Sequence, residues 1–145
     1  MSAEENKTLV RRFMEDVFNR GNLGLVDEIV VADFVEHEEL PPGTPPGREG
    51  LKALVAQFRG AFPDFQVTLD DVIAEGDRVV VRSTWRGTQR KEFMHIPPSG
   101  KRISFEVIDI IRIAGGKFQE HWGQMDSMLL MQQLGAVPAG QPAPA

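Results

Sequence analysis

The chain has no cysteine among its 145 residues, which excludes disulfide bonds, thiolate catalysis and cysteine-ligated metals. It also lacks any apolar run long enough to span a membrane. Its first residues (MSAEEN) are acidic and polar, unlike a signal peptide. We therefore expect a cytoplasmic protein that does not contact the membrane.

Concentrated positive charge is also missing. The formal net charge is −5, and the basic residues are scattered, with adjacent pairs at Arg11-Arg12, Arg90-Lys91 and Lys101-Arg102. Phosphate backbones require clustered Lys and Arg, so we expect no nucleic-acid partner. The 41% hydrophobic and 26% charged residues are typical of an ordinary globular protein. We predict one domain over residues 1–136 and a disordered Pro/Ala-rich tail over residues 137–145.

Hydrophobic periodicity predicts helices in the first half of the chain and mostly strands in the second half. A Pro- and Gly-rich loop at residues 41–47 precedes the third helix. This order indicates an α+β fold, in which N-terminal helices pack on a curved antiparallel sheet and enclose a conical pocket. The expected helices are 4–20, 25–30, 48–62 and a short one from 127, and the expected strands are 65–75, 78–87, 102–113 and 117–126.

One predicted strand carries an acid on its apolar face. Asp109 shares that face, by the period-two rule, with a row of apolar residues. An isolated carboxylate there is costly, so Asp109 must be paired, hydrated inside a cavity or protonated. The apolar residues are Ile103, Phe105, Val107, Ile111 and Ile113.

The turn after this strand decides what Asp109 meets. Residues 114–116 (AGG) suit a three-residue hairpin loop, which places Asp109 opposite His121. A two- or four-residue loop would instead turn Glu120, Trp122 and Asp126 to that face. We favour the first register, with a carboxylate–imidazole pair on a cavity wall. The alternative interpretation of the pair is a structural ion pair.

Five segments carry a resemblance to a known family: DFVEH at 33–37, FMHIPPSGK at 93–101, IRIAGGK at 111–117, EHWGQMD at 120–126 and QQLG at 132–135. From Leu9 to Gly135 the chain resembles the SnoaL-like polyketide cyclases, or ester cyclases, of the nuclear transport factor 2-like superfamily. The resemblance implies a cone-shaped α+β barrel, usually a homodimer, with an internal pocket and no cofactor. It also implies aldol closure of a polyketide ester by an acidic acid/base residue. In an ungapped pairing that acid falls on Gly123, and a cavity histidine falls on Asp109.

We predict Asp109 and His121 as the catalytic pair: either the imidazole is a base oriented by the carboxylate, or Asp109 with a raised pKa is itself the base or the proton donor. No His-x₃-His or His-Glu-x-x-His spacing is present, so no metal site is predicted. The ligand is expected to be a small hydrophobic compound. Predicted substrate contacts are His37, Arg82, Trp85, Met94, Trp122 and Met125.

Three functions are compatible with these residues. The first is a cofactor-independent enzyme that closes, isomerises or dehydrates a small hydrophobic carbonyl compound. The second is a non-catalytic binding or accessory module of the same fold. The third is an epoxide-type hydrolase, which would need Arg82 inside the pocket. Adjacent isoleucines on the outer sheet face (Ile108 and Ile110) predict a homodimer through that face.

Overall fold

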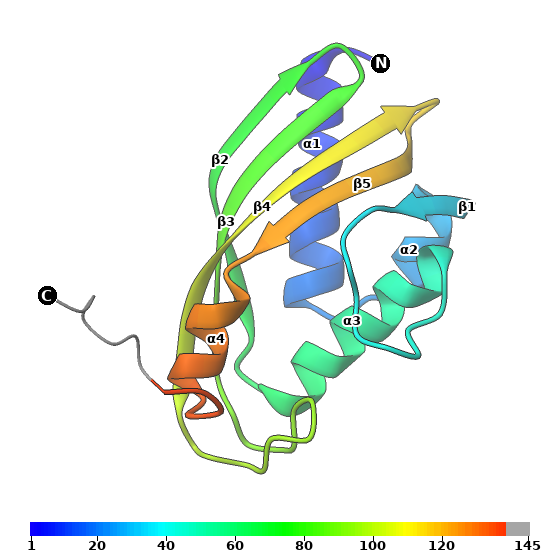
Figure 1. The fold of residues 1–145 in the computed structure, drawn as a ribbon. Coiled ribbons are helices and arrows are strands. Elements are labelled where there is room, and N and C mark those ends of the chain that lie inside the picture. The colour runs from blue at the N-terminus through cyan, green and yellow to red at the C-terminus, as the bar shows by residue number, and fades with distance from the viewer. Residues whose placement is uncertain (139–145) are drawn as a thin grey trace, which may run out of the picture.

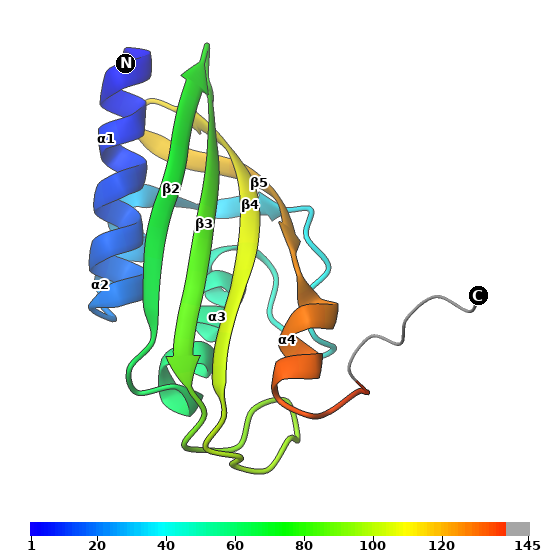
Figure 2. The ribbon, with the colours of Figure 1, turned by 90° about the vertical axis from the view of Figure 1, so that its left-hand side faces the viewer.

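The computed structural model describes residues 1–138, which form one five-stranded sheet with helices against its concave face (Figure 1). The fold is α+β, as predicted. The strand order is β1-β5-β4-β3-β2, and the sheet curves without closing into a complete barrel (Figure 2). Residues 139–145 of the predicted tail lie outside the described residues. The elements are α1 (Ala3–Phe13), η1 (Met14–Asn19), α2 (Gly24–Ile29), β1 (Val30–Glu36), α3 (Gly47–Ala61), β2 (Gln66–Glu75), β3 (Arg78–Thr88), β4 (Arg102–Ala114), β5 (Lys117–Met125) and α4 (Ser127–Gln133).

The first predicted helix forms in two parts. Ser2 and Glu5 make a reciprocal capping box that satisfies backbone N–H groups at the start of α1. The chain continues into the π-helical segment η1, whose backbone hydrogen bonds span five residues instead of four. Successive side chains are therefore rotated about the helix axis by a different angle. Met14 and Phe18 of η1 line a cavity beneath the sheet. The other three predicted helices appear near their expected positions.

The core lies between the helices and the concave face of the sheet. Along β4 every second side chain is buried, as predicted from its alternation, and Asp109 is buried with them at 8% exposure. Aromatic rings contribute to this core, and Phe58 of α3 packs edge-on against Trp85 of β3.

β1 joins the sheet in parallel with β5, whereas the other neighbouring strands are antiparallel. The predicted antiparallel sheet is therefore formed by β2 to β5, and β1 adds a parallel edge strand that was not among the predicted strands. The parallel pairing places Glu36 beside His121. The two segments are 85 residues apart, so no local pattern in the sequence indicates this contact.

The predicted three-residue hairpin loop between β4 and β5 is wrong. Ala114 pairs with Lys117, and Gly115 and Gly116 alone form the turn, with φ of 59° and 72°. Positive φ at both positions is the requirement of a type I′ turn, which glycine meets without strain. This loop alone would reverse the faces of β5, but Gln119 is an extra residue between the paired Phe118 and Glu120 and forms a bulge.

The bulge restores His121 to the concave side with a shifted register. Asp109 is opposite Gly123, and His121 is opposite Ile111. The prediction that Asp109 and His121 lie directly opposite each other is therefore also wrong, although both side chains face the cavity. Among residues 1–138, no helix is sufficiently long and apolar to cross a membrane.

Candidate active site

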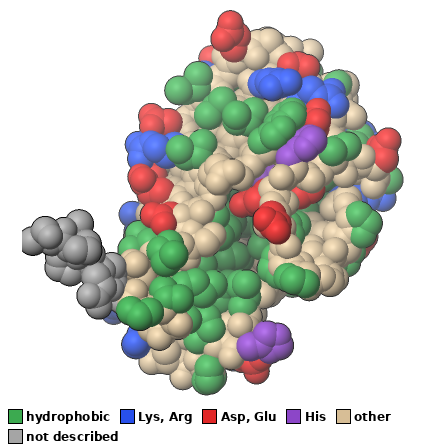
Figure 3. Space-filling view, viewed as in Figure 1, with side chains coloured by type: hydrophobic (Ala, Val, Ile, Leu, Met, Phe, Trp, Pro, Cys, Tyr) green, Lys and Arg blue, Asp and Glu red, His purple; other side chains and the backbone are tan. Residues whose placement is uncertain are grey.

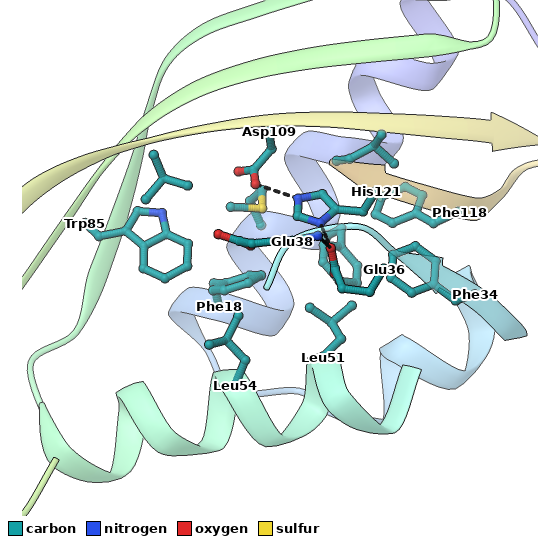
Figure 4. Close-up of a pocket in the computed structure, with 14 residues that line it drawn as sticks. Phe18, Phe34, Glu36, Glu38, Leu51, Leu54, Trp85, Asp109, Phe118 and His121 are labelled. Carbon is teal, nitrogen blue, oxygen red and sulfur yellow. Dashed lines mark hydrogen bonds and ion pairs between the residues drawn. The ribbon is translucent and has the colours of Figure 1, made fainter. Parts of the chain in front are cut away.

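An apolar cavity lies under the concave face, and four ionisable side chains meet in it (Figure 4). We call it the inner cavity. Its volume is about 40 Å³, which is room for a few water molecules and no more. The ionisable residues are Glu36, Glu38, Asp109 and His121, and the apolar wall comprises Phe13, Met14, Phe18, Phe34, Leu51, Leu54, Trp85, Val107, Ile111 and Phe118.

His121 is held between two carboxylates. Its Nε2 lies 2.7 Å from Oδ1 of Asp109, and its Nδ1 lies 2.6 Å from Oε1 of Glu36. The three side chains are only 12–15% exposed. Burial lowers the pKa of His121, but the hydrogen bonds to Asp109 and Glu36 outweigh it and raise that pKa to about 10.

This geometry corrects the predicted role of the imidazole. With a carboxylate at each ring nitrogen, both nitrogens donate and the ring is an imidazolium cation at neutral pH. A cation cannot accept a proton, so His121 cannot be the general base. Asp109 and His121 do meet as predicted, within an ion triad whose third member, Glu36, the sequence analysis did not identify as a site residue.

Glu38 is the fourth ionisable group, and its carboxyl points into the inner cavity beside the triad (Figure 4). Burial raises the pKa of Glu38 to about 7, and the charges of Asp109 and Glu36 raise it while His121 lowers it. Its backbone N–H donates to Oε1 of Glu36 over 2.9 Å, which fixes the chain as it leaves β1. Among the described residues, no side-chain hydrogen bond to the Glu38 carboxyl is present.

Glu38, like Glu36, was not among the predicted site residues. Side chains alternate along an extended segment, so Glu36 and Glu38 fall on the same side as the buried Phe34. His37 falls on the opposite side. Applying the period-two rule beyond the end of β1 would have identified both acids as facing inward.

A larger apolar chamber adjoins the inner cavity, and we call it the outer chamber. Its volume is about 320 Å³, within the range of small-molecule sites. Figure 3 shows hydrophobic side chains gathered in a hollow below a group of acidic ones. Glu38 and Leu54 line both spaces. The other residues that line the outer chamber are Glu39, Leu40, Pro41, Gln57, Phe58, Phe93, Met94, Met125, Ser127, Leu130 and Met131.

Three of the predicted substrate contacts line one of the two cavities. Trp85 lines the inner cavity, and its Nε1 donates to Ser83 over 3.1 Å. Met94 and Met125 line the outer chamber. Their contribution to binding stays a prediction.

The other three predicted contacts do not line either cavity, and this is a correction. His37 stacks on Trp122 with centroids 4.8 Å apart, and its Nε2 lies 2.6 Å from Oε2 of Glu120. Both rings belong to the outer side, because residues adjacent to Glu36 and His121 alternate away from the cavity. Arg82 pairs with Asp71 and Glu106 at 2.8 Å each on the same outer face.

Glu36, Glu38 and His121 also have carboxylate oxygen and ring nitrogen atoms within 4.8 Å of one another, a spacing at which they could be ligands of one metal ion. A metal ligand must offer a free lone pair, and each nitrogen of His121 faces a carboxylate instead. The group therefore fits an ion triad of two carboxylates and one imidazolium beside one exchangeable carboxyl.

Comparisons with known proteins agree with this architecture. The family model of the SnoaL-like polyketide cyclases matches residues 8–134. Aklanonic acid methyl ester cyclase DauD of Streptomyces sp. (strain C5) is 32% identical over 135 residues, covering 88% of this chain and 80% of that protein. Nogalonic acid methyl ester cyclase of Streptomyces nogalater is 28% identical over 124 residues, covering 84% and 92%.

The solved structure of TsrD from Streptomyces laurentii superposes with a TM-score of 0.84 at 32% identity, covering 94% of this chain and 99% of that one. A polyketide cyclase fold from Streptomyces antibioticus, IdmH, superposes with a TM-score of 0.74 at 32% identity, covering 89% and 98%. The match extends from α1 to α4 and includes every strand that lines the site. This chain belongs to the SnoaL-like polyketide cyclase family.

Proposed function

We propose that this protein is a cofactor-independent enzyme of acid–base chemistry on a small hydrophobic carbonyl compound. The reaction class is intramolecular aldol closure or a related isomerisation or dehydration. The observation that carries the proposal is the combination of a buried ion triad, a carboxyl whose pKa is raised to about 7, and an adjoining apolar chamber. General acid–base catalysis is most effective when the pKa of the catalytic group lies near the working pH.

The relatives narrow the reaction. Two of them are named as methyl ester cyclases of aklanonic and nogalonic acid. Such a closure forms a carbon–carbon bond between an enolisable carbon and a carbonyl carbon of one molecule. It requires a proton to leave carbon and a proton to reach oxygen, and both demands suit carboxyl groups in a water-poor site. We infer an ester-bearing polyketide as the substrate class.

Ring closure of aklanonic acid methyl ester by the purified protein, followed by chromatography and mass spectrometry, tests the proposal. We expect closure above the protein-free rate, and at least a tenfold loss in Asp109→Asn, because the ion triad sets the charge around the site. Glu28→Gln, an exposed carboxyl on α2 that lines neither cavity, is the control and should match the wild type. Closure no faster than in the protein-free reaction would refute the proposed enzymatic function.

A second candidate is a non-catalytic binding module. The narrowness of the inner cavity favours it, because the protein's own side chains nearly fill that space. It predicts that the ester binds but is returned unchanged, and that Asp109→Asn leaves its affinity unaltered. The epoxide-hydrolase alternative has no such support, since Arg82 lies in an ion-pair network on the outer face.

The outer face of the sheet supports the proposal of a homodimer. Ile108 of β4 is 49% exposed there, and Ile73 of the edge strand β2 is 62% exposed. Exposed apolar side chains on a broad sheet face are typical of a self-complementary interface. We also propose that the enzyme is cytoplasmic.

A further inference from the structure

We propose that Glu38 is the catalytic residue that carries the proton from substrate carbon to substrate oxygen. The ion triad of Asp109, His121 and Glu36 then acts through Glu38 by fixing its position and surroundings. This assignment rests on the proposed function and deepens it by naming the group that touches the substrate.

Position is the first argument. Glu38 is the one ionisable side chain among residues 1–138 that lines both the inner cavity and the outer chamber. Asp109 and His121 line the inner cavity alone, and that cavity holds a few waters at most. A substrate in the outer chamber therefore meets Glu38 before it can approach either member of the predicted catalytic pair.

Hydrogen bonding is the second argument. Both nitrogens of His121 are engaged, by Asp109 on one side and Glu36 on the other. Proton transfer from His121 would first have to break a short charge-assisted bond, and Asp109 and Glu36 each already accept from the imidazolium through one oxygen. The Glu38 carboxyl has no such bond within the described residues, so it can exchange a proton without dismantling the site.

Gly123 supplies the room for this carboxyl. A Cβ atom at position 123 would lie 2.9 Å from Oε2 of Glu38 and 2.7 Å from Cε1 of His121. Real side chains do not approach so closely, so only glycine lets both groups rest against the backbone of β5. The acid beside His121 thus comes from the segment after β1, and β5 leaves the space open.

The charges around Glu38 support its role. It faces Asp109 from β4, His121 from β5 and Glu36 from β1, while Glu39 lies on the chamber side. The triad carries one net negative charge, which together with burial raises the pKa of Glu38 to about 7. Near neutral pH the carboxyl is therefore present in both the base and the acid form.

The reaction balances with this single group. The Glu38 carboxylate takes a proton from the carbon next to a substrate carbonyl, and the C–H electron pair forms an enolate. The enolate carbon bonds to a second carbonyl carbon of the same molecule, and that carbonyl's π pair becomes an alkoxide. Protonated Glu38 then gives its proton to the alkoxide and is a carboxylate again. Negative charge moves from Glu38 to the substrate and back, so the site never holds an added charge.

The test compares Glu38→Gln, Glu38→Asp and the control Glu28→Gln in the closure of aklanonic acid methyl ester. Glu38→Gln keeps the shape and removes the titrating group, so we expect kcat to fall at least about 100-fold with KM within about threefold. The wild-type rate should rise as the pH increases through about 7, because this is the pKa of Glu38. This rise of the rate with pH should be absent in Glu38→Gln. In Glu38→Asp the rate should still rise with pH, but it should be lower than in the wild type at every pH. Thermal unfolding verifies that each variant is folded.

The outcomes separate this assignment from the proposed function. If Asp109→Asn loses activity but Glu38→Gln keeps more than about a tenth of the wild-type kcat, the assignment of Glu38 is wrong. The proposed enzymatic function is then still supported. An unchanged rise of the rate with pH in Glu38→Gln would also refute the assignment of Glu38. If the wild-type protein does not close the ester at all, the function and the assignment are both wrong.

Discussion

His121 and Asp109 touch diagonally across the β4–β5 hairpin, with Nε2 and Oδ1 2.7 Å apart although Asp109 is paired with Gly123. Diagonal neighbours in a sheet are within reach of long side chains when nothing stands between them. Gly123 leaves that space empty of any side chain, so the imidazole lies across the backbone and presents its other nitrogen to Glu36. The ion triad requires this missing side chain together with the parallel pairing of β1 and β5, which brings Glu36 beside His121.

The first prediction concerns His121 and pH. Its pKa is raised from 6.5 to about 10 in the folded protein. A base whose pKa is raised on folding stabilises the native state fully below pH 6.5, and that contribution is lost as the pH rises through about 10. We expect the free energy of unfolding to decline between pH 7 and 10, measured by urea denaturation. In His121→Gln this decline should be smaller, and an equal decline would contradict the ion triad.

Asp109→Asn gives the second prediction. It removes one charge from a buried pair, so we expect a loss of about 3–5 kcal/mol in the free energy of unfolding. It should also lower the pKa of His121, observable in the imidazole NMR signals. Asp71→Asn is the matched control, because Asp71 pairs with Arg82 at an exposed position and its loss should cost at most about 1 kcal/mol. Equal costs for the two variants would show that Asp109 is not effectively buried.

The third prediction is a gain in stability on loss of Glu38. Its pKa is raised from 4.5 to about 7, so charging this carboxyl opposes folding as the pH rises through that window. Glu38→Gln should therefore have a higher Tm than the wild type at pH 8 and a similar Tm at pH 4. Such a trade of stability for activity is characteristic of functional groups. A lower Tm at pH 8 would indicate a structural role for the carboxylate.

Much of the fold could be predicted from local patterns. Alternation along β4 identified the buried face and the single acid on it, and Asp109 is indeed buried there. The existence of the Asp109–His121 contact was also predicted. Its register was not, because two local events cancel: a two-residue turn at Gly115-Gly116 reverses the face of β5, and the bulge at Gln119 restores it. A bulge leaves no distinct sequence signal when neither neighbour is glycine.

The rest of the site depends on contacts between distant segments. Glu36 and Glu38 enter the cavity only because β1 pairs in parallel with β5, and no periodicity specifies that pairing. Gly123 could be read from the sequence as a position without an acid. That a carboxyl from the segment after β1 fills the space could not, since it follows from the position of Glu38 against the β5 backbone.

The fourth prediction concerns assembly. If the outer face of the sheet joins two copies, Ile108→Lys should place a charge in that interface and shift the protein from dimer to monomer. Light scattering distinguishes a dimer from the 16.1 kDa chain. Met128→Lys is the control, because Met128 is equally apolar and 63% exposed but lies on α4. A wild-type particle of 16 kDa would refute the dimer.

Gly123→Ala provides the fifth prediction and tests the origin of the site. The new Cβ would lie 2.7 Å from the His121 ring and 2.9 Å from the Glu38 carboxyl, so one or both must move. We expect the closure rate to fall at least tenfold, because Glu38 is displaced from the boundary of the two cavities, and the Tm to fall as the ion triad is strained. Gly60→Ala is the control: its Cβ would meet no atom within 4 Å, and in the last turn of α3 alanine should stabilise by at most about 0.5–1 kcal/mol. Activity at the wild-type level in Gly123→Ala would mean that the placement of Glu38 against β5 does not matter for the reaction, and the proton carrier would then have to be sought among the other groups of the outer chamber.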